Sequence, residues 1–438
     1  MQEIDTLIEA GWIIPVEPAN TVFTDYAIAI DKGRIVEILA APDAAIKYKG
    51  NQHHRYPGHV LLPGFVNTHT HASMSLLRGL ADDMPLMQWL QEHIWPAESQ
   101  HVNEEFVHDG TRLAMAEMLR CGTTCFNDMY FFPDVTARLA REAGMRATVG
   151  LIVLDFPTIW ASHADEYIEK GLAVNDHYRD DTLVTTAFAP HAPYTVSDGT
   201  LLHVQTLVNE LEIPIHIHLH ETADEIQQSI EQYGVRPIQR LSELGLLTPN
   251  LVAVHMTQLL DEEIETIAEN AVNVVHCPES NLKLASGFCP LSRLTQAGIN
   301  VALGTDGAAS NNDLDMLSEM RTAALLAKTV ANDARALDAM KAIELATLNG
   351  ARALGLDAEI GSLVAGKSAD IIAIDLASIE TQPVYHPESH IVYASSRDKV
   401  TDVWINGEHL LNQRELTRLD QKEILEKAHS WQQRIRTK

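Results

Sequence analysis

Residues 60–71 read Val-Leu-Leu-Pro-Gly-Phe-Val-Asn-Thr-His-Thr-His, an apolar, β-rich run that ends in two histidines. It is the first of eight strand-like runs along the middle of the chain, at 60–69, 123–129, 146–154, 183–190, 213–220, 251–255, 272–277 and 300–305. Helix-like segments separate most of them, at 103–120, 133–143, 198–211, 261–269 and 291–296. Strands alternating with helices of this length pair in parallel, and eight such units predict a (β/α)8 TIM-type barrel. A doubly wound open sheet is the competing fold, but no glycine-rich fingerprint follows the first strand.

The two ends of the chain differ from this alternating middle. The N-terminal part contains short β runs broken by turn signals, at 6–14, 26–30 and 34–39. The C-terminal part contains β runs at 369–375 and 400–405, and the second is followed by Asn406-Gly407, a strong hairpin signal. We therefore expect a small β-sandwich domain formed by both termini. The predicted α/β architecture divides into residues 1–59, the barrel over 60–360, and 361–438 with a terminal helix.

The composition excludes several classes of protein. Hydrophobic residues make up 46% of the 438, which supplies a large core and argues against intrinsic disorder. With 32 basic and 60 acidic residues the net charge is −28, so we expect no nucleic-acid partner, because phosphates would repel the chain. No apolar run approaches the roughly 20 residues of a membrane helix, and no basic targeting segment begins the chain. We expect a cytoplasmic protein without a membrane partner. A homo-oligomer is compatible with a barrel, but the sequence shows no diagnostic interface.

Histidines recur near the ends of the predicted strands. His69 and His71 lie two residues apart and therefore share one face of a strand. Residues 215–221 read Ile-His-Ile-His-Leu-His-Glu, which puts three imidazoles on one strand face. A hydrogen-bonded, barrel-lining histidine is the ordinary interpretation of any one of them, but a run of buried polar groups needs partners. Since imidazole suits zinc or iron, we expect at least one of the three to bind a metal.

Other polar residues end neighbouring strands. Asp306 closes the eighth strand before a glycine, where a turn residue is the ordinary interpretation. The sixth strand ends in His255 and the fourth in His191. Barrel enzymes place their chemistry at the carboxyl ends of the strands. Five strand ends that converge on histidine or carboxylate therefore predict a metal centre at that end of the barrel.

The sequence also resembles a known family. The segments that carry the resemblance are LPGFVNTHTHA (62–72), LLRG (76–79), WPAE (95–98), APHAPY (189–194), HLHET (218–222), HCPESNLKL (276–284) and GTDGAASNN (304–312). Together they are similar to the amidohydrolase superfamily, in its nucleoside-deaminase and chlorohydrolase branch, and most of all to the 5-methylthioadenosine/S-adenosylhomocysteine deaminases. The resemblance spans nearly the whole barrel. It implies a hydrolytic deaminase acting on a cyclic amidine, with a purine nucleoside as substrate.

The resemblance implies one divalent metal ion per subunit. The positions that match the family's ligands are His69, His71, His218 and Asp306. Other branches hold two metals bridged by a carbamylated lysine at the end of the fourth strand, but residues 185–191 contain no lysine. His216 and His220 then have supporting or barrel-lining roles. Zinc is the first expectation, and iron and manganese suit the same ligands.

The resemblance also implies catalytic and substrate-binding roles. Glu221 would protonate the purine ring nitrogen and assist the departure of ammonia, as a glutamate does in zinc base deaminases of another fold. His255 and Asp306 would orient the attacking hydroxide and take its proton. Glu98 would bind the ribose hydroxyls and His191 the purine, while Glu221 and Asp306 would also contact the substrate. A surface carboxylate is the plain alternative for Glu98.

One departure from the family concerns the substrate. Relatives that accept S-adenosylhomocysteine tend to carry an arginine early in the third strand, whereas we align Gly150 there, before an apolar stretch at 151–160. Arginine is the natural partner of a carboxylate, so we expect 5-methylthioadenosine to be preferred over S-adenosylhomocysteine, and adenosine to be accepted less efficiently. Arg78 and Arg179 are the alternative partners for that carboxylate.

Two other functions stay open. The first is another hydrolytic ring substitution with the same metal residues, namely deamination of guanine or a pterin, or dechlorination of a triazine. The second is a non-catalytic barrel scaffold, against which the complete set of metal residues argues.

Overall fold

The computed structural model describes residues 1–436, which contain two eight-stranded sheets. One is a parallel sheet with the order β12-β11-β10-β9-β8-β7-β6-β5. Its strands are β5 (Phe65–Thr70), β6 (Thr123–Tyr130), β7 (Arg146–Val153), β8 (Val184–Pro190), β9 (Ile215–Leu219), β10 (Leu251–His255), β11 (Asn273–His276) and β12 (Val301–Leu303). The N–H of Asp306 donates to the carbonyl of His69 (3.0 Å), and Asn67 Nδ2 donates to Thr305 Oγ1 (2.8 Å), which joins the end of β12 to β5. The predicted barrel is confirmed.

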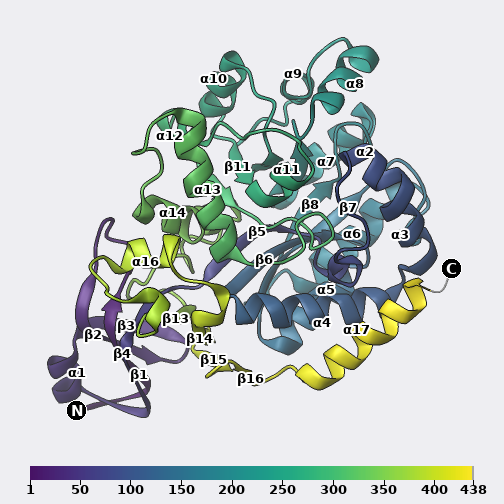
Figure 1. Cartoon of the computed structure of the whole chain (residues 1–438). Coiled ribbons are helices and arrows are strands. Elements are labelled where there is room, and N and C mark those ends of the chain that lie inside the picture. Colours follow the sequence, from purple (N-terminus) through teal and green to yellow (C-terminus); the bar gives the residue numbers. More distant parts are fainter. Residues whose placement is uncertain (437–438) are drawn as a thin grey trace.

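Helices surround this barrel (Figure 1). Those that follow the strands are α4 (Glu104–Arg120), α5 (Pro133–Ala143), α6 (Ala164–Tyr178), α7 (Asp198–Leu211), α8 (Ala223–Tyr233), α9 (Pro237–Glu243), α10 (Asp261–Glu269), α12 (Leu291–Gln296), α13 (Met316–Ala331), α14 (Ala339–Leu345) and α15 (Leu348–Ala353). Shorter elements lie in the loops at the carboxyl ends of the strands: η1 (Ala72–Leu77), α2 (Leu86–Trp89), the π-helical η2 (Leu90–Ile94), α3 (Trp95–His101) and α11 (Pro278–Lys283). The sequence pattern indicated five of these helices and missed the others, α6 and α8 among them.

Local signals in the sequence account for several helix ends. Asn103 caps α4 by accepting a hydrogen bond from the N–H of Phe106 (2.9 Å), and Thr222 caps α8 in the same way. Gly144 ends α5 with a φ of +74°, a left-handed conformation that glycine adopts without steric cost. These caps set where each helix begins after its strand, and therefore where the loops at the carboxyl end lie.

The second sheet joins the two ends of the chain, with the order β16-β15-β14-β13-β4-β1-β2-β3. Its strands are β1 (Gln2–Ile13), β2 (Phe23–Asp31), β3 (Arg34–Ala40), β4 (Tyr48–Pro63), β13 (Ile371–Asp375), β14 (Val400–Ile405), β15 (Glu408–Asn412) and β16 (Glu415–Leu416), with α1 (Ala41–Lys47) between β3 and β4. The pairing of β4 with β13 brings N-terminal and C-terminal residues side by side, as Figure 1 shows. The termini therefore pair as predicted, in one mixed sheet.

The predicted strand at 60–69 is divided between the two sheets. Residues up to Pro63 belong to β4, and β5 begins at Phe65. Gly64 lies at the transition, where a Cβ atom would meet the side chain of Thr124 at 2.0 Å. Only glycine fits this close approach, so the chain crosses from one sheet to the other at this residue.

The remaining elements are η3 (Ile379–Thr381), α16 (Pro387–Tyr393), η4 (Arg397–Lys399) and α17 (Gln421–Arg436). The last of these runs along α4 (Figure 1), and Trp431 Nε1 donates to Asp109 Oδ2 there (2.9 Å). Over residues 1–436, none of the helices combines the length and the apolar character needed to span a bilayer.

Candidate metal centre and substrate pocket

Three histidines and one aspartate meet at the carboxyl end of the barrel. His69 lies on β5 with His71 just after it, His218 lies on β9, and Asp306 follows β12. The Nε2 atoms of His69 and His218 are 3.1 Å apart. Asp306 Oδ1 lies 3.3 Å from His69 Nε2 and 3.2 Å from His71 Nε2. Ligands about 2.0–2.1 Å from a tetrahedral zinc ion are themselves separated by roughly 3.3 Å. His69, His71 and Asp306 therefore have the spacing of ligands of a single divalent cation, and His218 adjoins them through His69.

The electrostatic state of these residues also suits a cation. Burial lowers the pKa of His69 to about 4, and burial together with the neighbouring His69 lowers the pKa of His218 well below its usual range. Burial opposes ionisation of Asp306, but hydrogen bonds with His69 and His71 hold its pKa well below the usual value. Burial likewise opposes protonation of His71, yet Asp306 raises its pKa to about 9. Neutral imidazole and carboxylate are the metal-binding forms, so a cation would displace the proton held at His71.

Hydrogen bonds on the far side of each ring orient two of these histidines. Nδ1 of His71 donates to the carbonyl oxygen of Met129 (2.6 Å), and Nδ1 of His218 donates to the carbonyl oxygen of His191 (2.8 Å). A proton on Nδ1 leaves the lone pair on Nε2, the atom that faces the centre. The backbone therefore selects the tautomer that binds a metal.

The other two histidines of the fifth strand lie outside the cluster. His216 Nε2 is 2.8 Å from His69 Nδ1, and its Nδ1 is 2.8 Å from Asn127 Nδ2. His220 accepts a hydrogen bond from the N–H of Ile238 at the start of α9 (3.1 Å). His216 therefore supports His69, while His220 joins the end of β9 to the helical layer.

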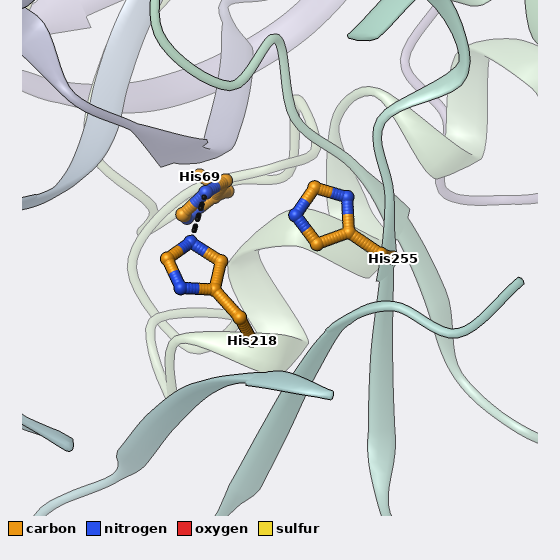
Figure 2. A group of neighbouring side chains, drawn as sticks. All are labelled: His69, His218 and His255. Atoms are coloured by element: carbon orange, nitrogen blue, oxygen red, sulfur yellow. Dashed lines mark hydrogen bonds between the residues drawn. The ribbon is translucent and has the colours of Figure 1, made fainter. Parts of the chain in front are cut away.

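His255 faces the same centre from β10. Figure 2 shows its ring turned toward those of His69 and His218. Its Nδ1 donates to Asn281 Oδ1 (2.8 Å), which leaves Nε2 as an acceptor, 3.8 Å from Glu221 Oε2. Glu221 is buried, and this burial raises its pKa. An acid that can hold a proton and an imidazole that can accept one therefore lie side by side.

Left-handed backbone conformations mark this end of the barrel. The φ angles are +52° at His220, +78° at His255 and +62° at Asp306. Non-glycine residues rarely adopt such angles, and they cluster at functional sites where the surrounding structure holds them. Each of the three follows or ends a barrel strand, and the turns at His255 and Asp306 aim these two side chains at the centre.

Asp306 is held through its second oxygen by two hydroxyl groups. Ser280 Oγ donates to Oδ2 at 2.6 Å and Ser310 Oγ donates to the same atom at 3.0 Å. Oδ1 is left to face His69 and His71. Both oxygens of Asp306 therefore have partners.

A cavity of about 670 Å³ opens beside the histidine cluster. Its polar part includes His71, His191, His218, Glu221, His255 and Asp306. Apolar side chains from η2, α3, the end of β7 and the loop after it form much of the remaining wall, including Leu90, Ile94, Trp95, Ile152, Leu154, Phe156 and Ile159. Within residues 1–436, no lysine or arginine lines this cavity. It therefore suits a ligand with one polar and one apolar, uncharged end.

Glu98 lies on the wall of this cavity, on α3. Tyr130 Oη donates to Glu98 Oε1 (2.6 Å), and desolvation raises the pKa of the Glu98 carboxyl to about 7. His191 also lines the cavity, and its Nδ1 is 3.1 Å from Thr195 Oγ1. The structure therefore brings Glu98 and His191 into the same space as the metal residues.

The structure corrects the argument built on position 150. A Cβ atom on Gly150 would lie 2.7 Å from the carbonyl oxygen of Asp128, so no arginine fits there, and the position does not line the cavity. The alternative partners are also engaged elsewhere, since Arg78 pairs with Glu117 and Arg179 pairs with Asp176. The apolar stretch at 151–160, by contrast, does contribute cavity wall, as expected.

Several residues of the site were missed from the sequence. Tyr130 directly follows a predicted strand that ends at Met129, so its position at a strand end was the signal. Asn281 and Ser310 lie within the quoted motifs, where nothing in the spacing indicates their partners. The contact of Asn281 with His255 joins two loops and depends on the tertiary structure, whereas Ser310 contacts Asp306 within one loop.

The comparisons with known proteins agree with this geometry. The model of the amidohydrolase family matches residues 60–410. A protein of Teredinibacter turnerae named 5-methylthioadenosine/S-adenosylhomocysteine deaminase is 51% identical over 435 residues, covering 99% of this chain and 98% of that protein. One of Saccharophagus degradans with the same name is 52% identical over 431 residues, covering 98% and 97%.

Solved structures share the fold of this chain. A crystal structure described as an adenosine deaminase from Xanthomonas campestris with bound zinc is 54% identical, with a TM-score of 0.99 and 100% coverage of both chains. An atrazine chlorohydrolase of Arthrobacter aurescens complexed with zinc is 21% identical, with a TM-score of 0.91 and coverage of 97% and 99%, which shows a shared fold. The resemblance seen in the sequence is confirmed. The chain belongs to the amidohydrolase family and, within it, to the 5-methylthioadenosine/S-adenosylhomocysteine deaminases.

Proposed function

We propose that this protein is a metal-dependent deaminase that hydrolyses 5-methylthioadenosine to 5-methylthioinosine and ammonia. The observation that carries the proposal is the cavity, in which a metal-ligand cluster and a buried carboxylic acid lie at one end and uncharged apolar side chains form much of the wall. A purine with an exocyclic amine suits the first part, and a thiomethyl group suits the second. S-adenosylhomocysteine and adenosine are secondary substrates in this proposal.

One divalent ion, for which we propose zinc, would be held by His69, His71, His218 and Asp306. The support is the spacing of their ligating atoms and the zinc bound in the 54% identical structure. When bound, such an ion lowers the pKa of water enough to supply a nucleophile near neutral pH. The remaining chemistry is proton transfer, which the side chains of this chain perform.

The reaction adds water to the purine carbon that carries the amine. The oxygen bonds to this carbon, one proton goes to the adjacent ring nitrogen, and the amine leaves as ammonia with another proton. Glu221 gives the first proton, because burial keeps its carboxyl protonated more readily than an exposed one. Glu221 then carries one proton of the attacking water to the departing amine and recovers its own proton from the second, as the carbonyl forms.

His255 takes the proton of the attacking water in this proposal. Its Nδ1 donates to Asn281, so Nε2 is the ring atom that faces Glu221, at 3.8 Å, and a proton taken up there can pass to that carboxylate. Asp306 orients the water. Its Oδ2 already accepts hydrogen bonds from two serine hydroxyls, so His255 is the better placed of the two as the base.

Glu98 and His191 bind the nucleoside in this proposal. The Glu98 carboxylate suits the paired hydroxyls of ribose, and the hydrogen bond from Tyr130 fixes its direction. His191 lies next to His218, with ring centroids 4.9 Å apart, close to where the purine would meet the attacking water.

Replacing Glu98 by glutamine is expected to raise KM for 5-methylthioadenosine more than it lowers kcat. Hydrogen bonds to a charged group contribute about 1.5–3 kcal/mol, which corresponds to a rise in KM on the order of tenfold to a hundredfold. Steady-state kinetics of ammonia release measure both constants. Glu92→Gln, at an exposed glutamate on η2, is the control and should behave as the wild type. An unchanged KM in Glu98→Gln would remove Glu98 from the substrate contacts.

Among nucleosides, kcat/KM is expected to be highest for 5-methylthioadenosine, lower for adenosine and lowest for S-adenosylhomocysteine. The charged tail of the last has no cationic partner in the cavity wall, so we expect a deficit of at least about tenfold. The measurement is ammonia release from the three nucleosides, guanine and a pterin, with chloride release from a chlorinated triazine. A higher value for any of the last three would favour the alternative ring substitution. Equal efficiency with S-adenosylhomocysteine would contradict the stated preference.

A further inference from the structure

Glu225 is a buried carboxylate that the proposed chemistry does not use. It lies in the first turn of α8 and is 3% exposed. Its Oε1 accepts a hydrogen bond from the N–H of His220 (2.9 Å), and its Oε2 accepts one from the N–H of Glu221 (2.7 Å). One side chain therefore holds two consecutive backbone amides of the turn that carries Glu221.

This arrangement departs from an ordinary helix cap. Thr222 and Glu225 have the spacing of a capping box, and Thr222 Oγ1 accepts from the N–H of Glu225 (3.2 Å) as such a box requires. In the usual box the glutamate returns a hydrogen bond to the backbone N–H of the cap residue. Here it reaches one and two residues further back, to Glu221 and His220. Glu225 therefore stabilises the turn that precedes the helix, and not only the N-terminus of the helix.

The turn itself has no strand partners at these amides. β9 ends at Leu219, and His220 has a φ of +52°, which takes the chain out of the sheet. Thr257 holds the turn from the other side, since its N–H donates to the carbonyl of His220 (2.9 Å) and its hydroxyl donates to the carbonyl of Glu221 (2.7 Å). The amides depend on Glu225, because a buried N–H without an acceptor is costly.

We propose that Glu225 is a positioning residue for Glu221. It fixes the peptide units on which the Glu221 side chain stands, and so keeps that carboxyl beside His255 and the cavity. The inference rests on the role proposed for Glu221. Because Glu225 touches neither the metal ligands' side chains nor the cavity, its loss acts on turnover and leaves metal and substrate binding intact.

The first test is Glu225→Gln, which keeps the shape but replaces one accepting oxygen with an NH₂ group that cannot accept. A small misplacement of a catalytic group can cost on the order of 10²-fold in rate, so we expect a loss in kcat of about 10–10². KM and zinc content should be unchanged. Glu225→Asp is one methylene shorter and cannot span both amides. It should show the same loss of kcat with unchanged KM and zinc content, and it replaces the glutamine variant in the test if that variant does not fold.

Thr222→Ala is the matched control. It removes the helix cap and leaves the amides of His220 and Glu221 with their acceptor, so it should lower the melting temperature and leave kcat unchanged. Wild-type kcat in both Glu225 variants, or an equal loss of kcat in Thr222→Ala, would overturn the positioning role.

A double-mutant cycle with Glu221→Gln separates this role from an independent one. If Glu225 acts through Glu221, then adding Glu225→Gln to Glu221→Gln causes no further loss of turnover. Losses that multiply would overturn the inference. A wild-type enzyme that releases no ammonia from any nucleoside would overturn the proposed function instead, which is a distinct result.

Discussion

Replacing His218 by alanine is expected to remove the bound metal and abolish deamination together. Its Nε2 lies 3.1 Å from that of His69, so the variant lacks one of the four side chains that we propose as ligands. Without the ion, water keeps a pKa near 15.7, and we expect turnover to fall on the order of 10⁴-fold or more. The same outcome is expected for His69→Ala, His71→Ala and Asp306→Ala. Elemental analysis and ammonia release are measured on the same preparation.

His203→Ala is the control for the loss of a histidine. This residue lies on α7 with a side chain that is 49% exposed, outside the cavity wall. It should keep both metal and activity. Full metal occupancy in His218→Ala would remove His218 from the ligand set and would direct attention to His255, which also faces His69.

Glu221→Gln is expected to keep the metal and lose most of its turnover. The amide retains the size of the carboxyl group but cannot carry a proton, and general acid–base groups typically contribute about 10²–10⁴-fold to the rate. The loss should appear in kcat, with zinc content equal to that of the wild type. The measurement pairs steady-state kinetics with metal analysis, and Glu231→Gln, at an exposed glutamate on α8, is the control. Near-normal turnover would mean that the proton travels by another route.

Much of the fold and of the metal site was accessible from the sequence because both follow short-range rules. A strand repeats every two residues, so His69 and His71, and likewise His216 and His218 of β9, are placed on one face. His220 departs from this rule, because β9 ends before it and its φ is +52°. The alternation of strands with helices leads to a parallel barrel, and a barrel collects the carboxyl ends of its strands in one place. His255 and Asp306, though far apart in the chain, therefore had to meet the other histidines.

The resemblance to a family suggested functional roles for individual histidines that their spacing in the sequence cannot distinguish. No periodicity distinguishes His218 from His216 as the ligand, since both lie on the same face of β9. The structure separates them by their partners: Nδ1 of His218 bonds to a backbone carbonyl and leaves Nε2 for the centre, whereas His216 contacts His69 and Asn127.

The residues that line the substrate pocket, and those that hold the turn at His220 and Glu221, could be identified only from the tertiary structure. Gly150 seemed from alignment to be the place where an arginine was missing, but the backbone of Asp128 closes that position, and the uncharged wall comes from η2, α3 and the loop after β7. Tyr130 meets Glu98 only once β6 and α3 pack together. Glu225 contacts amides four and five residues before it, but the turn that presents them is held by Thr257 from another loop. Periodicity is local and survives in any context, whereas the composition of a cavity depends on which loops the closed barrel brings side by side.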